Sequence, residues 1–442
     1  MSTRTDDAAR RRAAELALPL RTPADLDPLL ERIGDARLVL IGEASHGTAE
    51  YYRWRAELSR RLIAERDFSF VAVEGDWPDC HRVNGWVRGR NGAMSATEVL
   101  RAFDRWPTWM WANEEVADFV TWLRDFNRET GRQVGFHGLD VYSLWESMER
   151  VVEYVRDNAP EALDNAVAAV RCFEPFAEDP QRYAMSLRMV PTGCEDETVA
   201  LLSDLRRLVQ RQGDGEEDDF DALQNSEVVA GAERYYRTMV HADGDSWNVR
   251  DEHMADTLDR LLEHTDTRSK AIVWAHNTHV GDARATDMAR AGLTNIGQIA
   301  RERHGADDVV LVGLGGYAGH VIAGRRWGDP WERMEVPPAL PGSHEDVVHK
   351  LGSGRGLLVF GDGDGDGDGD GALNAWPHER RGHRAIGVVY DPARDALGNW
   401  VPTVLAARYD AFMWFDHTEA LHPLHVERRA ADREYETAPW GT

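Results

Sequence analysis

The amino-acid sequence predicts an α/β protein with a mostly parallel central sheet flanked by helices and a largely helical inserted cap subdomain. Short apolar runs alternate with long helical patterns along the chain, which is typical of parallel strands connected by helices. One interval departs from this alternation, because residues 141–270 follow a helical pattern almost throughout. We therefore expect residues 1–140 and 271–442 to form an α/β catalytic core, and residues 141–270 to form a helical insertion or cap.

The predicted strands are apolar runs at residues 37–41, 70–73, 133–136, 271–274, 309–312, 356–360, 385–390 and 411–415. After the sixth run, residues 361–371 read GDGDGDGDGDG. Alternating Asp and Gly cannot contribute to a core, so this tract predicts a flexible loop between two strands. A calcium site is the alternative, but the tract lacks the closing glutamate of a calcium-binding loop.

Composition excludes several classes of function. The chain has 442 residues, of which 42% are hydrophobic, so it can bury a large core. Its 51 basic and 77 acidic residues give a formal net charge of -26, which would repel nucleic acid and anionic lipid surfaces. No apolar run approaches the roughly 18 residues of a membrane span. We expect neither a nucleic-acid nor a membrane partner.

The cysteines and the N-terminus favour a cytoplasmic protein. Cys80, Cys172 and Cys194 are few, odd in number and not in a metal-type spacing, which fits a reducing compartment without a disulfide framework. The start of the chain, MSTRTDDAARRRAAELALPL, mixes acidic with basic residues and has only a short, broken apolar part. It is unlike a secretory signal.

Polar residues follow four of the predicted strands, at the point where each strand ends. The carboxyl ends of parallel strands meet at one edge of a sheet, where ligands bind. Any one of these strand ends is weak support for a site, because a strand must end in something polar, but four together predict a polar cleft. The residues are Glu43 and His46, Glu74 and Asp76, His137 and Asp140, and His276 and His279.

The turn after the first strand suits general-base catalysis. His46 can titrate near neutral pH, and Glu43, three residues earlier, can fix its tautomer and stabilise its charged form. The alternative is that Ser45 or Thr48 caps the next helix and His46 is merely exposed. Ser45 does not match a nucleophile elbow, because Glu43 occupies the position where that motif needs glycine. Cys80 fits a buried structural cysteine better than a nucleophile.

Several segments carry a resemblance to a known family. They are GEASHGTAEYYRWR, VAVEGDWPD followed by RVNGWVRG, FHGLDVYSLWESM, NVRDEHMADTL, VWAHNTHVGD and ALHPL, in this order. The chain resembles the erythromycin esterase family over roughly residues 35 to 425, and is most similar to its broad bacterial esterase-like branch.

The resemblance implies a hydrolase, linked to antibiotic resistance, that opens the macrolactone ester of erythromycin-type antibiotics with a histidine-activated water and without an acyl-enzyme. By this resemblance, His46 matches the general base, and Glu43 and Glu74 match supporting carboxylates. Arg55 and His276 match further members of the polar cluster, where they can offset charge or polarise a carbonyl. We expect a small-molecule ester as the partner, and neither a cofactor nor a metal.

Substrate contacts are expected from the other polar strand ends and from one aromatic segment. The segment DRWPTWMW can line a cleft for a bulky apolar ligand, although tryptophans more often pack in cores. The expected substrate-binding residues are Asp76, His137, Asp140, Trp109 and His279.

Two other functions stay open at the sequence level. In the first, Glu43, His46, Glu74, His276 and His279 hold zinc or a similar ion for metal-dependent hydrolysis of another ester, although these pairs lack the preset geometry of a helical metal motif. In the second, the same cleft binds a small molecule without turnover.

Overall fold

The structure is a computed structural model that describes residues 3–90, 92, 94–176, 180–187, 193–212, 217–239, 245–266, 268–361 and 376–425. Within these residues, eight strands form the central sheet in the order β3-β2-β4-β1-β5-β10-β7, with β6 paired to β5. Their bounds are β1 Leu38–Ile41, β2 Phe70–Asp76, β3 Gly135–Asp140, β4 Ala271–Trp274, β5 Val309–Ala323, β6 Glu332–Val336, β7 Arg355–Val359 and β10 Ala411–Thr418.

Most of the strand pairs are parallel. Strand β1 pairs in parallel with β4 and β5, β2 pairs in parallel with β3 and β4, and β10 pairs in parallel with β5. Only β7 and β6 run antiparallel to their neighbours in the described sheet. The predicted fold class is confirmed.

The continuous apolar run of β1 follows from burial on both faces. Val39 and Ile41 belong to one hydrophobic core, whereas Leu38 and Leu40 belong to another, as the two-residue period of a strand requires. Helices α2 (Asp27–Ile33), α3 (Ala49–Arg66) and α6 (Glu114–Thr130) contribute to the first core. Helices α1 (Thr3–Leu16), α12 (Asp245–Thr265), α14 (Ile296–His304) and α15 (His344–His349) contribute to the second.

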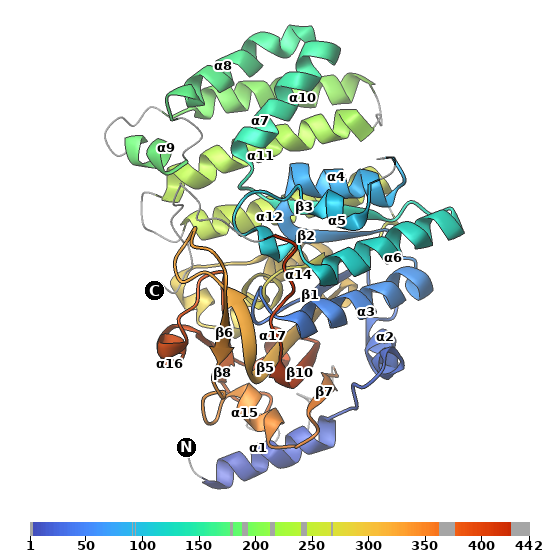
Figure 1. Ribbon diagram of the computed structural model, residues 1–442, viewed down its shortest axis with the longest axis vertical. Helices are drawn as coiled ribbons and strands as arrows, with labels where there is room; N and C mark the ends of the chain where they lie inside the picture. The colour runs from blue at the N-terminus through green and yellow to red at the C-terminus, as the bar shows by residue number, and fades with distance from the viewer. Residues whose placement is uncertain are drawn as a thin grey trace.

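The described elements between β3 and β4 are all helical. They include α7 Leu144–Asn158, α8 Leu163–Phe173, α9 Pro180–Leu187, α10 Glu195–Gln212, α11 Glu217–Met239 and α12. Helices α7, α8, α10 and α11 stack beyond one end of the sheet (Figure 1) and share a hydrophobic core of their own. Helix α12 differs, because Met254, Leu258 and Leu261 pack into the core beneath the sheet.

One strand prediction is wrong. Residues 385–390 form isolated bridges at Ile386 and Val389 and no extended ladder. The strands in this region are β8 (Arg381–Arg384) and β9 (Trp400–Thr403), which form a separate two-stranded sheet. Ile386 and Tyr390 are buried. The segment runs beside the turn that follows β1, where Ile386 N–H donates to the carbonyl of Ala44 at 2.8 Å.

The prediction of a chain without a disulfide is also wrong. Cys172, in α8, is bonded to Cys194, immediately before α10, while Cys80 is buried and free. Sequence spacing does not show which helices of a bundle lie side by side, and α8 packs directly on α10. The cysteine pattern therefore no longer supports a reducing compartment.

Two further expectations concern membranes and the glycine-aspartate tract. The described helices include none with the length and apolar character that a bilayer crossing requires. The predicted loop at 361–371 lies outside the described residues, apart from Gly361.

Candidate active site

The turn after β1 is packed against β5 and the end of β10. A Cβ atom on Gly47 would lie 1.9 Å from the carbonyl oxygen of Ile322, so only glycine fits there. The carbonyl of Gly47 accepts hydrogen bonds from the N–H groups of Ile322 and Leu421. These contacts fix the turn that carries Glu43 and His46.

Glu43 links His46 to a buried arginine. One carboxylate oxygen lies 2.9 Å from His46 Nδ1, and the other lies 2.8 Å from Arg55 Nη2. Arg55 is fully buried, with its guanidinium 4.1 Å from the centre of the Tyr52 ring. His46 is only 6% exposed, so it is not the solvent-exposed residue of the capping alternative. Because Nδ1 is engaged, Nε2 is the ring nitrogen left for chemistry.

Glu74, in β2, is held as an anion. Its Oε1 accepts a hydrogen bond from Arg250 at 2.7 Å, and its Oε2 accepts one from the backbone N–H of His276 at 2.8 Å. Burial alone would raise the pKa of Glu74, but the charges of His279 and Arg250 outweigh burial and hold that pKa well below its usual range. Glu74 is therefore a fixed negative charge and not a proton donor.

His276 presents a hydrogen-bond donor. Its Nδ1 accepts from the backbone N–H of Thr278 at 3.3 Å and lies 2.8 Å from the Thr278 hydroxyl. Burial, together with His46, lowers the pKa of His276 well below its usual range, so the ring is neutral and its single proton is on Nε2. Among the described residues this Nε2 has no partner, and the ring centre is 4.9 Å from that of His46.

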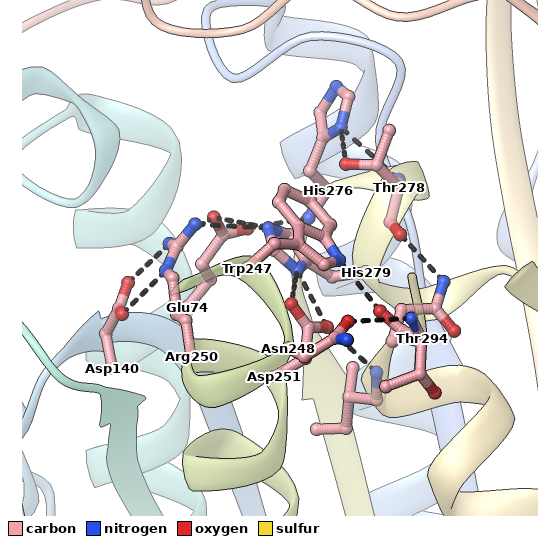
Figure 2. Close-up of polar contacts among 12 residues, drawn as sticks. Glu74, Asp140, Trp247, Asn248, Arg250, Asp251, His276, Thr278, His279 and Thr294 are labelled. Carbon is pink, nitrogen blue, oxygen red and sulfur yellow. Dashed lines mark hydrogen bonds and ion pairs between the residues drawn. The ribbon is translucent and has the colours of Figure 1, made fainter. Parts of the chain in front are cut away.

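His279 is enclosed by side chains from α12 that sequence reasoning missed. Figure 2 shows Trp247, Arg250 and Asp251 around His279. Asp251 lies 2.9 Å from Nδ1, and the Trp247 ring stacks on the imidazole at 4.5 Å between centres. Burial opposes the charged form of His279, but Asp251 and Glu74 favour it and raise its pKa to about 9.

Arg250 completes this arrangement by bridging two strand ends. It donates to both carboxylate oxygens of Asp140, at 2.9 and 2.6 Å, as well as to Glu74. The motif NVRDEHMADTL contains Arg250 and Asp251. Nothing in its spacing indicated that a helix in the predicted cap reaches the sheet edge, because Asp251 and His279 are 28 positions apart.

A cavity of about 720 Å³ adjoins the cluster. Its lining includes six of the predicted site residues, and also aromatic side chains, among them Phe103, Trp106, Trp111 and Trp327. The six are His46, Glu74, Asp76, Asp140, His276 and His279. A mixed polar and aromatic lining suits a medium-sized organic ligand.

Asp76 is a cavity carboxyl that holds its proton more tightly than usual. Its Oδ2 accepts a hydrogen bond from Arg105 Nε at 2.9 Å. Burial, helped by the nearby charge of Asp140, nevertheless raises the pKa of Asp76 to about 8. Asp76 can therefore donate a proton to a ligand near neutral pH.

Four predicted residues do not line the cavity. Glu43 and Arg55 lie behind His46 and reach the cavity only through it. His137 lies within β3, which continues to Asp140, and its ring stacks on Trp77 at 5.8 Å. Trp109 is fully buried in the hydrophobic core. The structure therefore places His137 and Trp109 away from the position expected of substrate contacts.

Two of the residues proposed for a metal site form ion pairs with side chains outside that set. Glu74 is paired with Arg250, and His279 with Asp251. Within the described part of the chain, no group of three or more His, Cys, Asp or Glu side chains is arranged to hold a metal ion.

Comparison with known proteins assigns the chain to a family. The family model for erythromycin esterase matches residues 63–418. Erythromycin esterase type II from Escherichia coli is 24% identical over 370 residues, which cover 76% of this chain and 83% of that protein. Erythromycin esterase type I from Escherichia coli is 21% identical over 315 residues, which cover 66% and 73%.

Solved structures share the fold. A succinoglycan biosynthesis protein is 20% identical, with a TM-score of 0.73, and the match covers 96% of this chain and 100% of that one. A histidine mutant of erythromycin esterase EreC in its open conformation is 16% identical, with a TM-score of 0.64 and coverage of 92% and 97%. The family match begins after the turn that carries Glu43 and His46 and spans β2 to β10 and α12, and the chain belongs to the erythromycin esterase family.

Proposed function

We propose that this protein cleaves a carboxylic ester with a water molecule activated by His46. Family membership supports an esterase-like hydrolase. The observation that carries the mechanism is the contact between His46 Nδ1 and Glu43 at 2.9 Å, with the histidine at the cavity wall. A histidine whose Nδ1 is fixed by a carboxylate can accept a proton at Nε2.

In the proposed reaction, His46 Nε2 takes a proton from water while the oxygen adds to the ester carbonyl. The imidazolium that forms is stabilised by Glu43, whose own position is held by Arg55. His276 donates its Nε2–H to the oxyanion. When the tetrahedral intermediate collapses, His46 returns the proton to the departing alkoxide, so the products are one acid and one alcohol.

For substrate, we propose a neutral small or medium ester, with a macrolide lactone as the first candidate. The mixed lining of the 720 Å³ cavity supports a ligand with both apolar and polar parts. A cyclic ester would open without losing a fragment, so its product would be heavier by one water.

The test is mass spectrometry of macrolides of several ring sizes, and of simple aryl esters, after incubation with the purified protein. We expect at least one macrolide to gain one water. If aryl esters are cleaved in a His46-dependent way while every macrolide is unchanged, the result supports the esterase activity and refutes the macrolide substrate. If a macrolide binds equally well to wild type and His46→Ala but no ester is cleaved, the protein is a binder.

A further inference from the structure

A second glutamate–histidine pair is buried behind the catalytic turn. Glu345, in α15, lies 2.5 Å from Nδ1 of His383, in β8, and each residue is only 1% exposed. The same carboxylate oxygen accepts the backbone N–H of Arg384 at 2.9 Å. Within the described chain neither residue lines the cavity, so neither contacts substrate. Burying a carboxylate is costly unless hydrogen bonds compensate, and His383 and the Arg384 N–H supply them to Glu345.

The protonation states of this pair determine which ring nitrogen of His383 donates a hydrogen bond and which accepts one. Burial lowers the pKa of His383, and the pKa of Glu345 is lowered to about 2 because His383 and the Arg384 N–H outweigh its burial. Glu345 is therefore ionised and His383 neutral. The single ring proton lies on Nδ1, facing the carboxylate, and Nε2 is an acceptor.

The partner of that acceptor is Asn277, next to His276 in the chain. Asn277 Nδ2 donates to His383 Nε2 at 3.2 Å and to the carbonyl of Leu314 at 2.6 Å. The carbonyl of Asn277 accepts from Arg408 at 2.8 Å. Every one of these contacts is buried, so the side chain has a single orientation.

Asn277 in turn contacts the catalytic turn. Its backbone N–H donates to the carbonyl of Glu43 at 2.8 Å. A Cβ on Gly42 would lie 2.0 Å from Asn277 Oδ1, so the amide packs directly on the backbone before Glu43. A shift of Asn277 would therefore move both His276 and Glu43.

We propose that His383 is a positioning residue for the esterase site: oriented by Glu345, it fixes Asn277 and thereby the relative placement of His276 and the Glu43–His46 pair. This inference rests on the proposed function. A small misplacement caused by a residue remote from the chemistry can cost up to about 100-fold in rate. Loss of the His383 to Asn277 contact lowers kcat by about 10- to 100-fold and leaves KM nearly unchanged.

Two substitutions at one position separate this role from general packing. In His383→Asn, the shorter amide can still donate to Glu345 but cannot reach Asn277. In His383→Gln, the longer amide can accept from Asn277. We expect the Asn variant to lose kcat and the Gln variant to recover most of it, with thermal unfolding showing both folded. The control is His304→Asn, which breaks a histidine–carboxylate pair with Asp259 that is remote from the cavity, and which leaves kcat unchanged.

Wild-type kcat in His383→Asn, or equal losses in the Asn and Gln variants, would overturn the proposal. A second readout does not need turnover: nitrogen-15 NMR of the His276 and His46 rings, assigned with variants of each histidine. Both ring signals are expected to shift in His383→Asn and to return in His383→Gln. Should no ester be cleaved by wild type, the proposed function fails, while these shifts still decide whether His383 positions the two rings; unchanged shifts refute it.

Discussion

Individual side chains in this site owe their chemistry to burial and paired charge. Glu74 and Asp76 are two residues apart on one strand, yet the pKa of Glu74 is held well below its usual range and that of Asp76 is raised to about 8. Burial raises both, and the difference comes from the counter-charges of His279 and Arg250 around Glu74. One carboxyl is thus a fixed anion and the other a proton donor.

Glu74→Gln tests the fixed anion. Removing the charge leaves Arg250 and His279 without their shared partner and weakens the contact to the His276 N–H. We expect kcat to fall about 100-fold or more. Initial rates on the best ester measure this, with Glu65→Gln, which breaks a surface pair with Arg61, as the matched control. Full turnover in Glu74→Gln would remove Glu74 from the mechanism.

The His279–Asp251 pair predicts a pH dependence of stability. The pKa of His279 is about 9 in the folded protein against an ordinary value of 6.5, so the folded state binds its proton more tightly. The stabilisation is fully present below about pH 6.5 and is lost as pH rises through about 9. The free energy of unfolding therefore falls across this window, by up to about 1.4 kcal/mol per pH unit from this group.

Asp251→Asn isolates the contribution of His279 to stability, because it removes the carboxylate that most favours the charged imidazole. Urea unfolding at several pH values is expected to show a shallower fall between pH 6.5 and 9 in the variant than in wild type. Identical slopes would mean that His279 is not protonated as its contacts require.

Among the secondary-structure elements, the sequence predicts the central strands of the sheet well and the edge and separate strands poorly. Strands such as β1 and β4 are apolar on both faces and stand out in the sequence. Strands β6, β8 and β9 read ERMEV, RGHR and WVPT and carry no apolar run, because they pair at edges or in a small separate sheet. The apolar run at 385–390 is explained by packing beside the turn that follows β1, a contact that no local pattern encodes.

The same limit applies to the site. Residues at strand ends, such as His46 and His276, are predictable because parallel strands bring their carboxyl ends together. Arg250 and Asp251 are not predictable in this way, since they lie on α12, and the packing of that helix against the sheet is a tertiary contact that local sequence does not encode. His137 was misplaced for a local reason, because β3 runs on to Asp140 and leaves His137 inside the sheet.

Gly47→Ala tests the turn that carries His46, the proposed general base. The added Cβ would meet the carbonyl of Ile322 at 1.9 Å, so the turn must move away from β5. We expect at least a 10-fold loss of kcat and a destabilisation of about 1–3 kcal/mol. Kinetics and urea unfolding measure both, with Gly361→Ala, where the added Cβ meets no atom of the described residues within 4 Å, as the control. Wild-type kinetics in Gly47→Ala would show that the turn tolerates displacement.

In the molecule as a whole, the helices beyond the sheet are cross-linked by a disulfide that lies away from the site. The disulfide between Cys172 and Cys194 closes a segment with a sequence separation of 22. Neither cysteine lines the cavity in the described structure, so stability and activity should separate here.

We expect Cys172→Ser to lower the free energy of unfolding by about 3 kcal/mol, as the loop-closure relation gives for a loop of this size. Its kcat should stay within about twofold of wild type, because no residue of the site lies in α8 or α10. Thermal unfolding with and without reductant, together with initial rates, measures both. A melting temperature that did not change on reduction would contradict a stabilising disulfide between Cys172 and Cys194.

The proposed reaction requires His46, fixed by Glu43, to be the base that activates water. The most direct measurement is kcat of His46→Asn beside His422→Asn, on an ester that wild type converts to a product heavier by one water. His422 also contacts a glutamate, Glu115, at 2.9 Å, but it lies outside the cavity lining in the described structure. We expect kcat to fall about 10²–10⁴-fold in His46→Asn, with unfolding unchanged, and to stay at the wild-type value in His422→Asn. Wild-type turnover by a folded His46→Asn protein would contradict it.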